Sequence, residues 1–207
     1  MKKKVLVLLA FFAIIPIVNA QSEVTYRDLE PVVNAIENQQ VTLQEIYDFV
    51  DSHRNNCLKK LFPGETIKVK ATDGNRTIFE SKEVFESWID PDFKNWNLNK
   101  PSQKTSETEA QVYEMVQNAN FKQMFGSLND DLDNICWTQH QIVGFCKNHQ
   151  DRLHSLTFFL FKENGAYFVA CVCVLSDGLD VHVNRFECGG VWGAEDAPRV
   201  VVPQLDD

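Results

Sequence analysis

The chain has 207 residues, and its 29 Asp and Glu outnumber its 20 Lys and Arg, which gives a formal net charge of −9. This acidic balance disfavours binding to nucleic acid or to anionic membrane surfaces, because both are recognised largely through clustered Lys and Arg. The length favours a single domain built around one hydrophobic core.

Residues 1–20 have the pattern of a cleavable export signal. Lysines at 2–4 precede an apolar run at 5–18, and the segment ends at Ala20. An N-terminal membrane anchor is the alternative, but the run is short for a bilayer span. We expect a signal peptide, then one α+β domain at 21–207 that is secreted and has no membrane contact after cleavage. The protein would be extracellular, or periplasmic if its source is bacterial.

All six cysteines follow the expected signal. An even number of cysteines in an exported chain predicts three disulfides and no free thiol. Two of them are two residues apart in an expected strand, so a bond between Cys171 and Cys173 is disfavoured. A metal site at Cys171, Cys173 and His182 is the alternative, but it lacks the paired CxxC spacing of structural zinc sites. We expect no metal and no cofactor. The predicted disulfide residues are Cys57, Cys136, Cys146, Cys171, Cys173 and Cys188.

The part at 21–135 is expected to form helices and one small hairpin. Apolar residues recur at three- and four-residue intervals in 29–36 and again in 43–61. A capping-box pattern at 42–45 marks the start of the second and longer helix.

A small hairpin is expected next. Short alternating segments at 66–70 and 77–79 flank Asp73, Gly74 and Asn75, three residues that favour a turn. Asn75 also begins an acceptor sequon, so this turn would carry a glycan in an organism that glycosylates exported proteins.

Two further helices are expected before the sheet. One occupies 81–89, with Ser81 as its N-cap and Trp88 as a core anchor. The other occupies 106–116 and begins with a second capping-box pattern. The polar segment 92–104 between them is expected to be a loop. Three apolar residues after these helices are expected to be buried: Phe121, Met124 and Phe125.

The main antiparallel sheet is expected at 136–190, with a strand at 141–147 as its first member. Asn164 and Gly165 are a strong two-residue turn signal between strands at 156–162 and 167–175, because both turn positions need positive φ. Counting outward from this turn pairs Phe161 with Phe168, Phe159 with Ala170, Phe158 with Cys171, and Leu156 with Cys173.

A second two-residue turn is expected at Asp177 and Gly178. It predicts the pairs Val174 with Val181, Val172 with Val183, and Cys173 with His182. The remaining tail at 191–207 is expected to be extended, either as an edge strand or as a segment available to a partner.

These pairings give the sheet two unequal faces. Helices are expected to cover the first face, and disulfide-tied segments or a ligand to cover the second. The first face collects Phe159, Phe161, Phe168, Val172, Val174, Val181 and Val183. The second face collects Leu156, Phe158, Cys171, Cys173, His182 and Asn184.

Sequence motifs for catalysis are few. The chain has no GxSxG, HExxH, phosphate-binding loop or dinucleotide-binding motif. The candidate catalytic group is His182 as a base, with Asp180 or Asp73 as its carboxylate partner. An exposed Asp and a half-buried His beside a turn are also ordinary structural residues. Candidate ligand-binding residues are Phe158, His182 and Asn184, whereas His140, His149 and His154 are expected to lie on the surface.

The expected elements occur in a suggestive order: a helix ending at Leu61 and Phe62, a hairpin around Asp73, a short helix beginning at 81–85, and a curved meander. This order resembles the nuclear-transport-factor-two-like domains of the cystatin-like α+β class, over 43–90 and 139–187. The resemblance implies a cone-shaped sheet whose mouth binds small apolar ligands, hosts catalysis in some members, or serves association. The chain departs from that pattern by an insertion at 91–138 and by its cysteines.

These features predict an α+β fold in which N-terminal helices pack on a C-terminal curved antiparallel meander sheet, stabilised by disulfides. The expected function is a secreted, non-catalytic binding domain for a small apolar ligand or a protein partner. Two alternatives stay open. One is a secreted hydrolase or isomerase that uses a His–carboxylate pair in a cone-shaped pocket. The other is a structural or host-interaction protein without a pocket.

Overall fold

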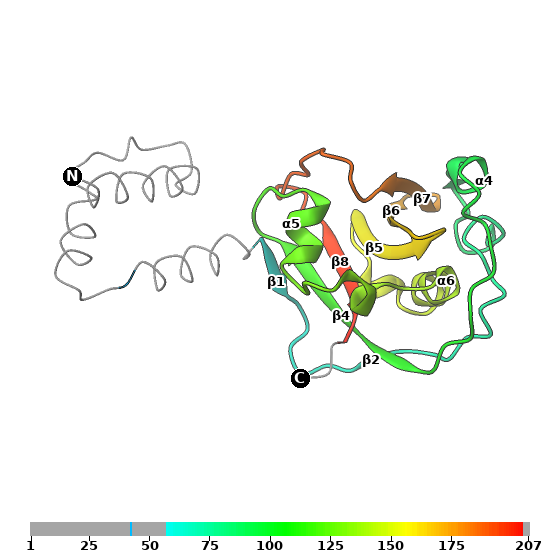
Figure 1. The fold of residues 1–207 in the computed structure, drawn as a ribbon, viewed down its shortest axis with the longest axis horizontal. Coiled ribbons are helices and arrows are strands. Elements are labelled where there is room, and N and C mark those ends of the chain that lie inside the picture. Colours follow the sequence, from blue (N-terminus) through cyan, green and yellow to red (C-terminus); the bar gives the residue numbers. More distant parts are fainter. Residues whose placement is uncertain (1–41, 43–56, 205–207) are drawn as a thin grey trace. The chain divides into compact units, whose positions relative to one another are not determined.

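The computed structural model describes residue 42 and residues 57–204, and the latter belong to one compact unit (Figure 1). The expected signal peptide and the helix expected at 29–36 lie outside the described residues, as does most of the helix expected at 43–61. None of the described helices has the length and apolar character that a membrane span requires.

An eight-stranded sheet forms the framework, and its order is β1-β4-β8-β5-β6-β7-β3, with β2 also paired to β4. It is a mixed sheet, because β3 pairs with β7 and β5 pairs with β8 in parallel. The prediction of N-terminal helices packed on a C-terminal antiparallel meander is therefore wrong. The strands are β1 (Leu58–Lys60), β2 (Ile67–Val69), β3 (Trp88–Ile89), β4 (Thr108–Met115), β5 (Leu156–Glu163), β6 (Ala166–Leu175), β7 (Gly178–Arg185) and β8 (Arg199–Pro203).

Short helices lie against the two faces of this sheet. The described helices are α4 (Asp92–Asn95), α5 (Phe121–Gly126) and α6 (Gln139–Asn148), together with the 3-10 turns η2 (Leu132–Ile135) and η3 (Gln150–Arg152). Both longer helices begin with a capping box, formed by Asn120 and Gln123 in α5 and by Thr138 and Gln141 in α6. A capping box satisfies two backbone N–H groups that a helix start leaves without partners.

The hairpin of β5 and β6 confirms the register predicted from its turn. Phe161 lies opposite Phe168, and Phe158 lies opposite Cys171. Asn164 and Gly165 have φ angles of 52° and 76°, the left-handed values that this turn requires.

The next hairpin, between β6 and β7, is shifted by two residues from the prediction. Leu175 lies opposite Gly178, so the turn consists of Ser176 and Asp177, and Cys171 rather than Cys173 lies opposite His182. Gly178 is the first residue of β7 and packs so closely on Glu86 that an added Cβ would lie 3.1 Å from the Glu86 Cβ. An even shift leaves every side chain on its predicted face.

Both faces of the sheet are covered by apolar side chains. On the first face, Phe159 and Val172 pack with residues of α6 such as Phe145. On the second face, Phe158 packs with Phe121. The predicted burial of the three residues around α5 is confirmed for Phe121, Met124 and Phe125. The second face is thus covered by a helix, and not by disulfide-tied segments.

Several elements expected from local patterns differ in the structure. The helix expected at 106–116 is strand β4, and the strand expected at 141–147 is helix α6. The helix expected at 81–89 is a series of turns followed by β3. In β4, alternation places Ala110 and Val112 in the core, which a helix would not do.

Strands near both ends of the described chain pair differently from the predictions. Strand β2 pairs with β4 rather than with 77–79, and the segment at 58–60, expected to end a long helix, is β1. The expected edge strand in the tail is β8, which lies in the middle of the sheet between β4 and β5 (Figure 1). Its residues Val200, Val201 and Val202 are buried, which explains the three consecutive valines.

The disulfide prediction is wrong, because all six cysteines are free. Cys146 belongs to the hydrophobic cluster on the first face of the sheet. Cys57 and Cys171 belong to the cluster on the second face, with Cys136 packed against it. The sheet separates these groups, and the buried thiols occupy positions that a small apolar side chain would fill.

Candidate functional site

The candidate site forms where β7 meets the short edge strand β3. Asp180 and His182 are two residues apart in β7, so their side chains point to the same face. Trp88 lies directly opposite Asp180 in the parallel pair, and Asp90 follows two residues after Trp88. Four side chains from two short segments therefore meet on one face.

The side chains of this group lie close together, although the His182 nitrogens are not within close hydrogen-bond distance of either carboxylate. The Nε2 atom of His182 is 3.5 Å from Oδ2 of Asp180, and its Nδ1 atom is 4.0 Å from Oδ2 of Asp90. The indole ring of Trp88 lies against the imidazole at a tilt of 46°, with 4.6 Å between ring centroids. His182 thus lies between two carboxylates and against an aromatic ring.

Asp90 is held by the backbone on both sides. Its Oδ1 accepts a hydrogen bond from the Asp92 N–H at 2.9 Å, and its Oδ2 accepts one from the Val183 N–H at 3.2 Å. The carboxylate ends the pairing of β3 with β7 and begins the turn into α4. Its side chain is only 15% exposed, so its position is fixed before any ligand binds.

The Asp180 side chain is about as buried as that of Asp90, at 13% exposure. Its Oδ1 is buried and makes no hydrogen bond of ordinary geometry within the described chain, although the Cys173 thiol interacts with the carboxylate. Cys173 lies opposite Asp180 in β6. Burial, reinforced by the Asp180 carboxylate, raises the pKa of the Cys173 thiol to about 12. Burial likewise raises the pKa of Cys171 to about 12, although the Asn184 amide donates a hydrogen bond to its sulfur at 3.3 Å. Both thiols are therefore protonated near neutral pH and are poor nucleophiles.

The predicted partner Asp73 does not reach His182. Instead its Oδ1 lies 3.1 Å from Nδ1 of His140. Hydrogen bonds from the backbone and side chain of Asn75 hold the Asp73 pKa below its usual value. Asn75, the sequon residue, is exposed.

The other two histidines that were expected on the surface have structural contacts. The Nε2 atom of His149 is 2.9 Å from the Lys68 carbonyl oxygen, and Nδ1 of His154 is 3.1 Å from the Ser155 hydroxyl. Both histidines are half-buried, so neither is as open to solvent as expected.

The predicted ligand-binding residues do not form one site. Phe158 is fully buried between Phe121 and Trp192, with ring centroids 5.4 and 5.0 Å away. Asn184 is half-buried and contacts Cys171. Of the predicted group, only His182 remains accessible, with a side chain 45% exposed.

Trp88 and Asp90 were not identified as site residues from the sequence. Trp88 was expected to anchor the core, yet it is 42% exposed. The signal that could have found them is the spacing of two residues in a strand, which places Trp88 and Asp90 on one face. Interpreting 81–89 as a helix concealed it.

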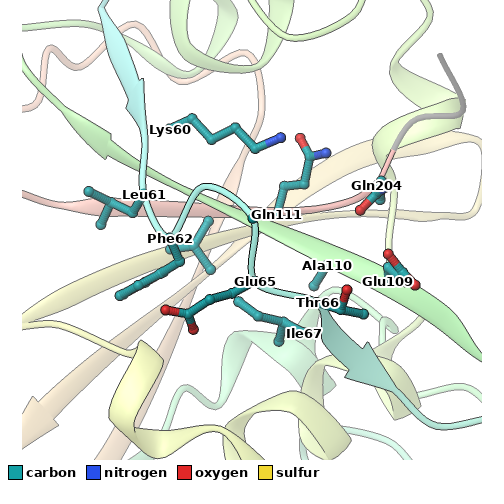
Figure 2. Close-up of a pocket in the computed structure, with 12 residues that line it drawn as sticks. Lys60, Leu61, Phe62, Glu65, Thr66, Ile67, Glu109, Ala110, Gln111 and Gln204 are labelled. Carbon is teal, nitrogen blue, oxygen red and sulfur yellow. The ribbon is translucent and has the colours of Figure 1, made fainter.

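Two cavities lie elsewhere in the domain. One of about 260 Å³ lies between the β1–β2 connection and β4, and charged side chains such as Lys60, Glu65 and Glu109 line it. In Figure 2, Lys60 and Gln111 extend toward one another, whereas Phe62 points away from them. The second cavity, of about 230 Å³, lies beside α6, and it is lined by Ser102, Asp133, Cys136, Trp137, Thr138, Gln139, Phe161, Lys162 and Glu163.

The described residues hold no group of three or more His, Cys, Asp and Glu side chains that could bind a metal ion. The alternative of a metal at Cys171, Cys173 and His182 therefore lacks a suitable arrangement there. Comparisons with protein families, with curated proteins and with solved structures gave no match. The resemblance to nuclear-transport-factor-two-like domains stays a prediction.

Proposed function

We propose that the protein is a non-catalytic binding domain that recognises a protein partner at the β7–β3 surface. This surface consists of Trp88, Asp90, Asp180 and His182, together with Leu175, which lies in β6 two residues after the partner of Asp180, Cys173. The observation that supports the proposal most directly is the 42% exposure of Trp88 beside two carboxylates. Trp is among the residues that most often dominate the binding energy of protein interfaces.

The buried side chains on both faces of the sheet favour a protein partner over a small apolar ligand. Phe158 and Phe159, neighbours in β5 that point to opposite faces, are both 0% exposed. Small apolar ligands need a concave apolar site, and side chains occupy the space on both faces at this point. The cavity in Figure 2 has charged side chains in its lining, which suits polar groups. A surface with exposed Trp88 and Leu175, by contrast, suits contact with another chain.

The same geometry favours binding over hydrolysis or isomerisation. His182 and Asp180 form a His–carboxylate pair, but neither lines either of the two cavities described above. The adjacent thiols of Cys171 and Cys173 have raised pKa values and are not activated nucleophiles. Export, as residues 1–20 predict, would place the partner outside the cytoplasm.

A peptide-display library tests the proposal, because it presents many candidate partner sequences at once. The full chain and two variants, Trp88→Ala and Val116→Ala, are panned in parallel. Val116 is the matched control, because it is 47% exposed and lies just after β4, far along the sheet from β7. We expect enriched peptides that bind the unchanged chain and the control equally, and bind Trp88→Ala at least about tenfold more weakly. Failure to enrich any peptide that depends on Trp88 would overturn the proposal.

A further inference from the structure

We infer that the β7–β3 surface binds a cationic side chain, lysine or arginine, of the partner protein. This inference rests on the proposed function and adds the chemistry of the group that is recognised. It follows from three observations: acidic segments at the site, a mostly buried carboxylate that has no Lys or Arg partner, and an aromatic ring beside that carboxylate.

The two segments that form the site carry only acidic charges, apart from His182. The segments 86–92 and 175–184 contain five acidic residues and no Lys or Arg. They are Glu86, Asp90, Asp92, Asp177 and Asp180. A positively charged group that approaches these two segments therefore meets net attraction, and the net charge of −9 extends that attraction to longer range.

The two carboxylates of the site lack the cation that most buried or half-buried carboxylates have. Within the described residues, Asp90 and Asp180 have only His182 as an ionic neighbour. Some carboxylates elsewhere in the domain do have Lys or Arg partners, as Asp133 does with Lys162 at 2.7 Å.

Asp180 carries this argument furthest. Its side chain is 13% exposed, its Oδ2 lies 3.5 Å from Nε2 of His182, and the Cys173 thiol, a weak donor, interacts with the same carboxylate, so no Lys or Arg compensates this charge within the described residues. Burial of a carboxylate is costly unless a charge or hydrogen-bond donors compensate it. A cation from the partner would supply that compensation, so the cost already present in the free protein becomes a gain on binding.

Trp88 provides the second half of a cation site. Indole is the aromatic ring that attracts ammonium and guanidinium groups most strongly. The same chain uses this contact on the opposite face of β7, where the Arg185 guanidinium lies 4.9 Å from the centre of the Trp96 ring. Arg185 is thus already engaged there, and Trp88 has no cation over its ring within the described residues.

Three short peptides test the inference by NMR titration of the full chain, with the Trp88 indole N–H resonance as the readout. The probes are the acetylated and amidated tripeptides Gly-Lys-Gly, Gly-Arg-Gly and Gly-norleucine-Gly. The first two carry a cation, and the third has a similar length without one. Trp88→Phe identifies the Trp88 resonance among the four tryptophans.

We expect the lysine and arginine peptides to shift the Trp88 resonance and the norleucine peptide to leave it unchanged. Asp180→Asn should weaken binding at least about tenfold, whereas Asp133→Asn, which removes a carboxylate paired with Lys162, should not. Should Asp180→Asn fail to fold, the unchanged chain still decides the matter, because raising the salt concentration must weaken a charge-dependent contact.

The outcomes separate this inference from the function on which it rests. If the norleucine peptide shifts Trp88 as much as the lysine peptide, the site recognises apolar groups and the inference is wrong. If no tripeptide binds but library peptides without Lys or Arg still depend on Trp88, the inference is wrong and the binding function stands. If no library peptide depends on Trp88 either, both are wrong.

Discussion

The centre of the sheet and its β7–β3 edge differ in what covers them. At the centre, β5 carries Phe158 and Phe159 on opposite faces, and both are fully buried. At the edge, Trp88 is 42% exposed and the His182 side chain is 45% exposed. Residues at the centre are determined by packing, whereas those at the edge are free of that requirement. Side chains at the edge are therefore the ones that the proposed binding function can use.

The largest expected effect tests the packed side of this comparison. Phe159→Ala should lower the free energy of unfolding by about 3–5 kcal/mol, because it deletes a fully buried ring from the cluster that α6 covers. Urea denaturation monitored by circular dichroism measures the change. Val174→Ala is the control. Val174 lies in β6 on the same face of the sheet as Phe159 but is 44% exposed, so its removal should change the free energy of unfolding by less than about 0.5 kcal/mol. Equal effects would remove the distinction between centre and edge.

The next largest effect is the pH dependence of stability, and it comes from free thiols buried on the two faces at the centre of the sheet. Burial raises the pKa of Cys171 to about 12 and raises that of Cys146 well above its ordinary value of 9.0. These thiols ionise at lower pH in the unfolded chain than in the folded chain. Their contribution to the free energy of unfolding is therefore complete below pH 9 and declines as pH rises from 9 towards 12. The decline is on the order of 1 kcal/mol per pH unit for each thiol.

Unfolding measured from pH 7 to pH 10 should therefore show lower stability only at the alkaline end, with a smaller slope in Cys171→Ala. Labelling of the denatured, unreduced chain with a thiol reagent should modify all six cysteines. If no cysteine reacted, the cysteines would be paired in disulfides and the free thiols of this structure would be wrong.

Sequence patterns were most informative at the centre of the sheet. The β5–β6 register followed from Asn164 and Gly165, because a two-residue turn with positive φ fixes every pair beyond it. The two unequal faces followed from the same count and survived the shift between β6 and β7. These features are local, so one short segment contained the information needed to predict them.

The edge and the middle strand could not be predicted in the same way. β8 enters the sheet between β4 and β5, and β3 pairs with β7 across about ninety residues of sequence, and no local pattern specifies such pairings. The helix expected at 106–116 had a capping-box pattern that tertiary packing overrode to give β4. The site was missed for this reason, since Trp88 and Asp90 become neighbours of His182 only through the pairing of β3.

A third prediction concerns the helix that covers the first face. Thr138 accepts a hydrogen bond from the Gln141 N–H at 3.3 Å, as the N-cap of α6. Thr138→Ala should cost about 1 kcal/mol of unfolding free energy, because one N–H group of the first turn loses its partner. Lys147→Ala, at an exposed position of the same helix, is the control. An equal loss in both variants would show that the cap contributes nothing beyond helix propensity.

The smallest expected effect on stability belongs to His182, at the edge. His182→Ala removes an exposed side chain whose nitrogens lie 3.5 Å or more from either carboxylate, so the unfolding free energy should change by less than about 0.5 kcal/mol. The Phe159→Ala and His182→Ala variants should then reverse their order when peptide binding is measured on folded protein. His182→Ala should weaken peptides selected through Trp88, because the imidazole supports the indole at 4.6 Å, whereas folded Phe159→Ala should bind them normally. A His182→Ala variant that is strongly destabilised would instead identify the cluster as part of the fold, and the exposed indole would need another explanation.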